Sequence, residues 1–442
     1  MNPNQTDLLR QEERLVSNFA PLSARSEATT RRTYNRPLDD AGTQFETWAD
    51  TIHRSHYEHH KRLWEDAGGT PDFNELGELV ALGMDRSGLV SGRTLWLGGT
   101  PYAYERAASM FNCSATQLDS VFDMVDAFWL LLNGCGVGGQ PSCGTLHGYY
   151  RRVPELKVVP SERDKDYRGH KENREELPAE SNDWTWTIVV GDSAQAWAKA
   201  GGKMLASPRG RCDRLVLDFS NVRGAGGRLK GYGWICNGYK PMAEAMEAIH
   251  AILNRQAGNL LDEEDILDIF NWFGTVLSSR RAAEAGLMSQ FNPRVAQFAS
   301  RKKNYWRCKA CGSDNTRANL CLDCGARDTN TQRRQSNNSI MFWTRPSVDD
   351  IADLLYMNLD GGEPGFVNAT AALNKCPWFK LFNPCVPGET LITTRDGDVR
   401  IDSVVGQQVE VWNGEEWSMV TPAITGGKPI TGRMEEIIRV TL

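Results

Sequence analysis

The chain has 442 residues, of which 40% are hydrophobic and 24% charged, and its formal net charge is -6. This balance is typical of a globular protein with a substantial core, and the length allows two or three domains or one large α/β barrel with additions. The negative charge argues against a broad electrostatic contact with nucleic acid. The longest apolar runs fall short of the ~20 residues that span a bilayer, and the first residues lack signal-peptide character. We therefore expect a cytoplasmic protein without a membrane partner.

The first part of the chain is predicted to be helical. Helical patterns cover residues 45–64 and 75–84, and residues 91–100 indicate a turn, a short strand and a second turn. Four histidines fall in the first helix: His53, His56, His59 and His60. Their spacing would place three imidazoles on one face, which leaves a metal site as an alternative to the polar helix face that we favour.

Further along, strands alternate with helices, which predicts a largely parallel sheet or barrel. Strands are expected at residues 109–116, 184–190 and 214–219, and helices at 121–132, 193–205, 242–257, 264–286 and 348–359. A glycine-rich loop is expected at residues 133–140. Glycines allow backbone N–H groups to approach a phosphate, but the loop matches neither a P-loop nor a dinucleotide fingerprint. A tight packing turn is an equal alternative.

Four of the eleven cysteines form one cluster: Cys308, Cys311, Cys321 and Cys324. Two Cys-x-x-Cys pairs nine residues apart present four thiolates, the set that zinc prefers, and predict a structural zinc ribbon over residues 304–330. Since all four ligands are cysteines, no coordination position is left for catalysis. A redox dithiol pair is the alternative. Basic residues flank the cluster, Arg301-Lys302-Lys303 before it and Arg333-Arg334 after it, and they suggest a contact with nucleic acid as an alternative. We favour a small insertion held by zinc over that alternative.

The sequence changes character at Cys385. Asp396-Gly397 and Asn413-Gly414 each separate two β-type runs and predict two hairpins, and residues 435–442 indicate one more strand. Because this strand reaches the last residue, we expect its pairing partners to lie outside the given sequence.

Nine short motifs occur in order along the chain: Arg32-Thr-Tyr-Asn-Arg-Pro-Leu, Gly92-Arg-Thr-Leu-Trp-Leu-Gly-Gly-Thr, Phe111-Asn-Cys, Asn133-Gly-Cys-Gly-Val-Gly, Lys230-Gly-Tyr-Gly-Trp-Ile, Ser279-Arg-Arg-Ala-Ala-Glu, Gln335-Ser-Asn-Asn-Ser, Gly362-Glu-Pro-Gly-Phe-Val-Asn and Asn383-Pro-Cys. As a set they resemble the adenosylcobalamin-dependent (class II) ribonucleoside-triphosphate reductases of the monomeric type, over residues 28–384. The zinc ribbon is not part of that family's core pattern.

This resemblance implies an α/β fold. A helical N-terminal region (1–105) would precede an incomplete ten-stranded α/β barrel (106–384). It also implies adenosylcobalamin as cofactor, a ribonucleoside triphosphate as substrate, a deoxynucleotide effector and a thioredoxin-like reductant. The glycine loop at residues 133–140 would lie among the nucleotide-binding loops.

Site residues follow from the same resemblance. Cys113 matches the redox-active cysteine that would reduce the substrate and end each turnover in a disulfide. Asn383 matches the residue that binds a substrate hydroxyl, and Cys385 stands at the position of the thiyl radical. Ser336, Asn337 and Asn338 match a segment expected near the substrate cleft.

The junction departs from the family pattern. The family continues Asn-Pro-Cys-x-Glu, with the glutamate as acid/base, whereas here Glu389 comes two residues too late. Cys385-Val-Pro-Gly-Glu-Thr-Leu-Ile-Thr resembles the first block of an intein, so we expect residues 385–442 to be an all-β (Hint-type) N-terminal intein fragment. Cys385 would then be a splicing nucleophile that attacks the Pro384 carbonyl to form a thioester.

On this interpretation the given sequence is an N-terminal portion of a reductase. It would be inactive alone, without the second redox cysteine and most of the cobalamin-binding part. The alternative is half of a split-intein precursor that acts in trans-splicing with a C-terminal intein–extein chain.

Overall fold

The structure is a computed structural model. It describes residues 23–39, 42–111, 113–141, 152–177, 184–210, 212–229, 235–276, 284–301, 311–313, 316–317, 320–326, 332–333, 336–359, 363–377, 379–381, 391–395, 397–400, 403, 407–412, 417–420, 423–426 and 437–439. The chain divides into two compact units. One comprises Met1–Phe111, Lys230–Gly233 and Pro384–Leu442, and the other comprises Asn112–Leu229 and Trp234–Asn383. Each is described by itself.

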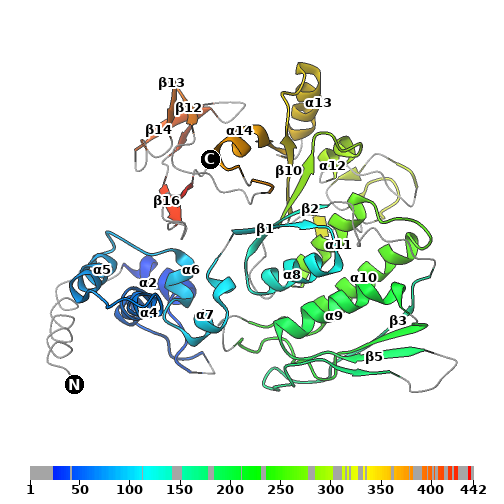
Figure 1. Cartoon of the computed structure of the whole chain (residues 1–442), viewed down its shortest axis with the longest axis horizontal. Helices are drawn as coiled ribbons and strands as arrows, with labels where there is room; N and C mark the ends of the chain where they lie inside the picture. Colours follow the sequence, from blue (N-terminus) through cyan, green and yellow to red (C-terminus); the bar gives the residue numbers. More distant parts are fainter. Residues whose placement is uncertain are drawn as a thin grey trace. The chain divides into compact units, whose positions relative to one another are not determined.

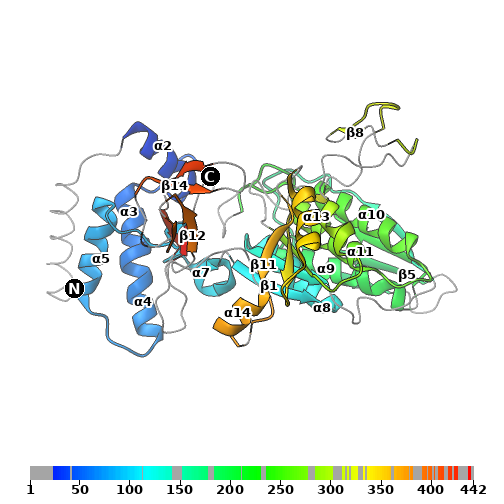
Figure 2. The ribbon, with the colours of Figure 1, turned by 90° about the horizontal axis from the view of Figure 1, so that it is seen from above.

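The first unit begins with helices, as predicted: α2 (Ala24–Thr33), α3 (Trp48–Ile52), η1 (His53–Glu58), α4 (His59–Asp66), α5 (Phe73–Asp85), α6 (Gly92–Leu97), α7 (Pro101–Glu105) and η2 (Ala107–Met110). The segment α3–η1 packs against α5 (Figure 2). Ile52, Leu76 and Val80 form the core between them. The strand expected within residues 91–100 is wrong, because Ser91 caps a helix there: its Oγ accepts a hydrogen bond from the Thr94 backbone N–H at 3.2 Å.

Two of the four histidines do not belong to an exposed polar helix face. His56 and His59 are 1% and 8% exposed. The element η1 is a π-helix, whose wider turn shifts the side chains away from the 3.6-residue spacing on which the expectation depended. Burial lowers the pKa of both imidazoles to about 4, with the charge of His60 as a second cause.

The second unit is built on a parallel five-stranded sheet in the order β1-β2-β7-β10-β11. Its strands are β1 (Cys113–Leu118), β2 (Gly136–Pro141), β7 (Glu284–Ser289), β10 (Ser336–Phe342) and β11 (Gly365–Asn368). Figure 1 labels three of these strands, β1, β2 and β10. The predicted parallel sheet is confirmed. Closure into a ten-stranded barrel stays a prediction.

A second, four-stranded sheet has the order β3-β6-β5-β4. Its strands are β3 (Glu155–Val159), β4 (Arg174–Glu176), β5 (Thr185–Val189) and β6 (Arg214–Asp218). Between the two sheets lie α8 (Val121–Leu132), α9 (Ala194–Ala206), α10 (Lys240–Arg255) and α11 (Glu263–Thr275) (Figure 1). Their apolar side chains join those of both sheets in one core, in which the rings of Phe128 and Phe273 stack at 4.3 Å.

Capping explains where two of these helices start. Ser120 and Asp123 form a capping box at α8, and Asp262 and Asp265 form one at α11. Two expectations are wrong here. The helix predicted over residues 264–286 ends at Thr275, and residues 284–289 form β7. The predicted glycine loop is largely strand β2, which pairs on both edges.

Shorter elements complete the second unit: η4 (Ser207–Arg209), α12 (Val295–Ser300), β8 (Thr316–Arg317), β9 (Leu320–Cys321), α13 (Val348–Leu359) and α14 (Ala369–Lys375). None of the helices in the described ranges is both long and apolar enough to cross a membrane.

The C-terminal strands are antiparallel. The strands β12 (Leu391–Thr394), β13 (Gly397–Arg400), β14 (Val409–Trp412) and β15 (Trp417–Val420) form one sheet, and β16 (Ala423–Gly426) pairs with β17 (Ile437–Arg439). The two predicted hairpins are present as the pairs β12–β13 and β14–β15. The expectation that the last strand pairs only outside the given sequence is wrong, because β17 pairs with β16. The assignment of this region to an intein stays a prediction.

Candidate functional site

Two of the expected site positions lie at one edge of the five-stranded sheet. Cys113 is the first residue of β1, and Ser336 is the first residue of β10. Residues near the starts of four adjacent strands are register partners and form one row across the sheet: Ser114, Val137, Glu284 and Ser336. Three interstrand steps separate β1 from β10, or about 14 Å. Cys113 and Ser336 therefore share the amino edge of the sheet.

The two side chains nevertheless belong to opposite faces, because side chains alternate along a strand. Ser336 and Asn338 lie on the same face as Ile340, which packs in the helical core. Asn337, between them, is exposed, whereas Ser336 and Asn338 are buried. The expected substrate segment therefore contributes Asn337 to one face and two buried polar side chains to the other.

Cys113 is exposed and lies on the face of Asn337. This follows from Leu118, five residues later on β1, which packs in the helical core. The row that leads from β1 to Asn337 contains only small residues, Ala115, Gly138 and Ala285. Ala115 is exposed in this row, whereas Gly138 and Ala285 are buried.

The buried polar group at the start of β10 is held by hydrogen bonds. The Ser336 hydroxyl donates to Asn338 Oδ1 at 3.0 Å. The Asn338 side-chain amide donates to Glu363 Oε2 at 3.0 Å, and its backbone N–H donates to the same oxygen at 3.2 Å. Glycine at position 286 leaves room for this group, since a Cβ there would lie 2.7 Å from Asn338 Oδ1 and displace it.

Sequence reasoning did not assign a role to Glu363. The available signal was its place in the Gly362-Glu-Pro-Gly motif, directly before β11. Asn383, Cys385 and Cys308, three of the expected site residues, lie outside the described residues.

The other three cysteines of the cluster come together. The sulfur atoms of Cys311, Cys321 and Cys324 lie within 4.8 Å of one another, and Cys321 is fully buried. Cys311 Sγ and Cys321 Sγ are 3.7 Å apart, far beyond the ~2.05 Å of a disulfide. A tetrahedral zinc ion with Zn–S bonds of ~2.3 Å holds its sulfur ligands about 3.8 Å apart. The spacing of these thiols fits such an ion.

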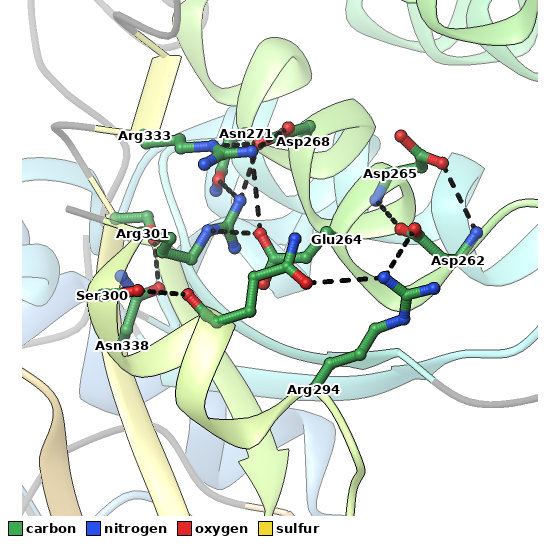
Figure 3. A network of polar contacts seen from close by, with 12 residues as sticks. Asp262, Glu264, Asp265, Asp268, Asn271, Arg294, Ser300, Arg301, Arg333 and Asn338 are labelled. Atoms are coloured by element: carbon green, nitrogen blue, oxygen red, sulfur yellow. Dashed lines mark hydrogen bonds and ion pairs between the residues drawn. The ribbon is translucent and has the colours of Figure 1, made fainter. Parts of the chain in front are cut away.

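The basic flanks of the cluster are partly engaged. Arg301 and Arg333 form buried ion pairs with Glu264 and Asp268 of α11 (Figure 3). Arginines held in this way are not available to phosphates, so these two residues do not support the nucleic-acid alternative.

Known proteins with similar sequences are reductases. The chain is 25% identical over 396 residues to the adenosylcobalamin-dependent ribonucleoside-triphosphate reductase of Lactobacillus gasseri, covering 78% of this chain and 48% of that protein. It is also 25% identical over 388 residues to the enzyme of the same name from Lacticaseibacillus paracasei, covering 77% and 48%. Such reductases are oxidoreductases. The chain spans about half the length of the curated relatives it matches.

A solved structure has a similar fold. It is a B12-dependent (class II) ribonucleotide reductase, with a TM-score of 0.61 and 19% identity, and the match covers 90% of this chain and 55% of the other. No family model matches the chain. The comparisons thus relate the sequence to adenosylcobalamin-dependent reductases and the fold to the class II enzymes.

Proposed function

We propose that this chain is the N-terminal portion of an adenosylcobalamin-dependent ribonucleoside-triphosphate reductase. Sequence similarity over more than three quarters of the chain supports this. The observation that carries it is the position of Cys113, exposed at the start of β1 in a parallel sheet, on the same face as Asn337. A thiol that must meet both a substrate and an external reductant has to be accessible.

In this proposal Cys113 and a second cysteine, which belongs to the part of the protein beyond this sequence, together give two electrons to the ribonucleotide and become a disulfide. A thioredoxin-like dithiol then reduces that disulfide back to two thiols. Asn337, on the same face, contacts the ribonucleoside triphosphate. The buried pair Ser336 and Asn338, held by Glu363, positions the start of β10. Asn383 binds a substrate hydroxyl. Adenosylcobalamin supplies the radical when bound, and most of the residues that hold it belong to the part of the protein beyond this sequence.

The cysteine cluster is proposed as a structural zinc site with Cys308, Cys311, Cys321 and Cys324 as ligands. Its support is the 3.7 Å sulfur–sulfur distance and the burial of Cys321. Glycines after the second cysteine of each pair, Gly312 and Gly325, both have φ +74°, a left-handed conformation that suits glycine in a tight turn. We expect one zinc ion per chain.

Residues 385–442 are proposed as the N-terminal part of an intein that interrupts the reductase before its thiyl cysteine. The antiparallel hairpins from β12 to β15 are compatible with an all-β splicing domain. Cys385 then forms the thioester with Pro384, and the reductase cysteine begins the downstream segment. The split form, with a separate C-terminal intein–extein chain, is the second candidate.

The test joins the chain to its downstream continuation. Expression of both should yield a ligated product at the Pro384 junction, followed by a Cys-x-Glu sequence, and Cys385→Ala should stop ligation. A continuation without Cys-x-Glu, or the absence of ligated product, contradicts the intein proposal.

The ligated enzyme should form deoxynucleotides from ribonucleoside triphosphates with adenosylcobalamin and a dithiol. Cys113→Ser should lower this turnover by about 100-fold or more, because the redox thiol is lost. Cys212→Ser, in the second sheet's region, is the control and should retain it. Unchanged turnover in Cys113→Ser would show that the proposed redox role is wrong.

A further inference from the structure

The two ends of the cysteine-rich insertion meet on one carboxylate. Arg301, directly after α12, donates from Nη2 to Asp268 Oδ1 at 2.7 Å. Arg333, on the far side of the cluster in sequence, donates from Nε to the same oxygen at 2.7 Å and from Nη2 to Oδ2 at 2.5 Å. Asp268 of α11 thus bonds the residue that leads into the insertion and the residue that leads out (Figure 3).

A second carboxylate completes this group, which we call the stem clamp: Glu264, Asp268, Arg301 and Arg333. Arg301 Nε lies 3.3 Å from Glu264 Oε2, and Arg333 Nη2 lies 3.6 Å from it. Two carboxylates facing two guanidinium groups balance in charge, as burial requires. The side chains of Arg301, Glu264 and Asp268 are 1%, 5% and 7% exposed.

The two carboxylates differ in their environment. Desolvation raises the pKa of Glu264 against the opposing charges of the arginines. Desolvation acts on Asp268 as well, but the hydrogen bonds and charges of Arg333 and Arg301 outweigh it and hold the pKa of Asp268 below its usual range. Asp268 accepts three hydrogen bonds from the two arginines, whereas Glu264 lies 3.3 and 3.6 Å from them, so Asp268 is the stronger anchor.

The segment that leads out of the insertion at Arg333, here called the far stem, is followed closely by the candidate site. Arg333 precedes Ser336 by three residues, and Ser336 opens β10 with the hydrogen-bonded group of Asn338 and Glu363. A shift of Arg333 off Asp268 would pull on the first residue of the strand. Since α11 also packs on β2 and β7, the clamp is anchored in the body of the sheet.

We infer that the cysteine cluster is a metal-dependent positioning device for the amino end of β10, and that the stem clamp transmits its state. With zinc bound, the insertion holds Arg333 on Asp268 and keeps Ser336 and Asn338 in place. Without zinc, the far stem loses this restraint and β10 opens more often. The inference depends on the proposed zinc site and adds a regulatory role to it; Asp268 is its positioning residue.

Hydrogen exchange of the full chain tests this, because opening of β10 appears as faster amide exchange. Removal of zinc by a chelator should accelerate exchange in residues 336–342 by about tenfold, equivalent to ~1.4 kcal/mol of opening free energy, and readdition of zinc alone should reverse it. Peptides covering β5 and β6, in the second sheet, should exchange at the same rate in both states.

Variants separate the clamp from the metal. Asp268→Asn should still bind one zinc ion, yet β10 should exchange fast whether or not zinc is present. Arg294→Ala removes a more exposed ion pair with Asp262 at the start of α11 and should keep the wild-type response to zinc. If Asp268→Asn does not fold, the chelation experiment on the wild-type chain decides by itself.

The outcomes distinguish the two proposals. Failure to bind zinc would remove the zinc site and the inference with it. Zinc binding without any change in the exchange of residues 336–342 would overturn the inference and leave the zinc site standing.

Discussion

Asn338 donates two hydrogen bonds to one oxygen of Glu363, from its side-chain amide at 3.0 Å and from its backbone at 3.2 Å. A single carboxylate oxygen therefore fixes both the strand and the rotamer of a buried residue. It also ties β10 to the residue two before β11 begins. This arrangement makes Glu363 a structural partner of the substrate segment.

Removal of this acceptor should be costly. Glu363→Ala leaves two buried donors of Asn338 without their acceptor and should destabilise the second unit by about 1.5–3 kcal/mol. Chemical denaturation measures the change. Glu363→Gln keeps an acceptor oxygen and is the matched control, with a smaller loss expected. Equal losses in both variants would mean that charge, not hydrogen bonding, is what Asn338 requires.

Two glycines in helix interiors should respond oppositely to alanine. A Cβ at Gly202 of α9 would lie 2.3 Å from Val125 Cγ2 of α8, so Gly202→Ala should destabilise by about 1–3 kcal/mol despite its better helix propensity. A Cβ at Gly77 of α5 meets nothing within 4 Å, so Gly77→Ala should stabilise by about 0.5–1 kcal/mol. Thermal unfolding of both variants checks this. A stabilised Gly202→Ala would show that α8 and α9 can move apart.

The buried imidazoles should make the first unit sensitive to acid. The pKa of His56 and that of His59 fall to about 4 in the folded state, mainly through desolvation, against 6.5 when unfolded. As the pH falls, the imidazoles of the unfolded state therefore bind protons at a higher pH than those of the folded state. Stability is complete above pH 6.5 and is lost as the pH falls toward 4, by on the order of 3 kcal/mol for each imidazole.

Unfolding measured between pH 7 and 4 tests this. The double substitution His56→Leu and His59→Leu should flatten the profile over that range. His53→Gln, at a position whose side chain is 40% exposed, is the control and should keep the wild-type slope. A slope unchanged by the double substitution would assign the acid sensitivity to other groups.

Thiol labelling should separate the cysteines. Cys113 is exposed and should react with iodoacetamide in the native protein, whereas Cys135 and Cys236 are buried and should react only after unfolding. Burial also raises the pKa of the Cys236 thiol, which lowers its thiolate fraction further. Peptide mass spectrometry reads out each site. Protection of Cys113 in the native chain would argue against access for an external reductant.

Local signals in the sequence were sufficient for several elements. The apolar run of α8 begins at the Ser120–Asp123 capping box, and both features lie within fifteen residues. The hairpin β12–β13 is expected from the Asp396-Gly397 dipeptide in the sequence, and the two strands pair in register from Leu391–Arg400 to Thr394–Gly397. In these cases the hydrophobic pattern and the terminating residues agree, so no distant contact is needed to choose the structure.

Tertiary contacts decided the rest. Residues 284–289 contain Glu, Ala, Leu and Met, which favour helices, yet they form β7 because β2 and β10 pair on its two edges. The burial of His56 depends on a π-helical turn, which the spacing of residues in the sequence does not predict. Asp268 and Glu363 acquire their roles from partners 65 and 25 residues away.

Side chains alternate between the two faces of β10. The candidate site should therefore be more sensitive to the number of residues before this strand than to which residues they are. A single inserted or deleted residue between Arg333 and Ser336 that slipped the strand by one position would exchange its two faces. Asn337 would then enter the helical core, and Asn338 would leave Glu363. Relatives that preserve this chemistry should therefore vary freely in the length of the cysteine-rich insertion, but hold constant the spacing from its far stem to the strand.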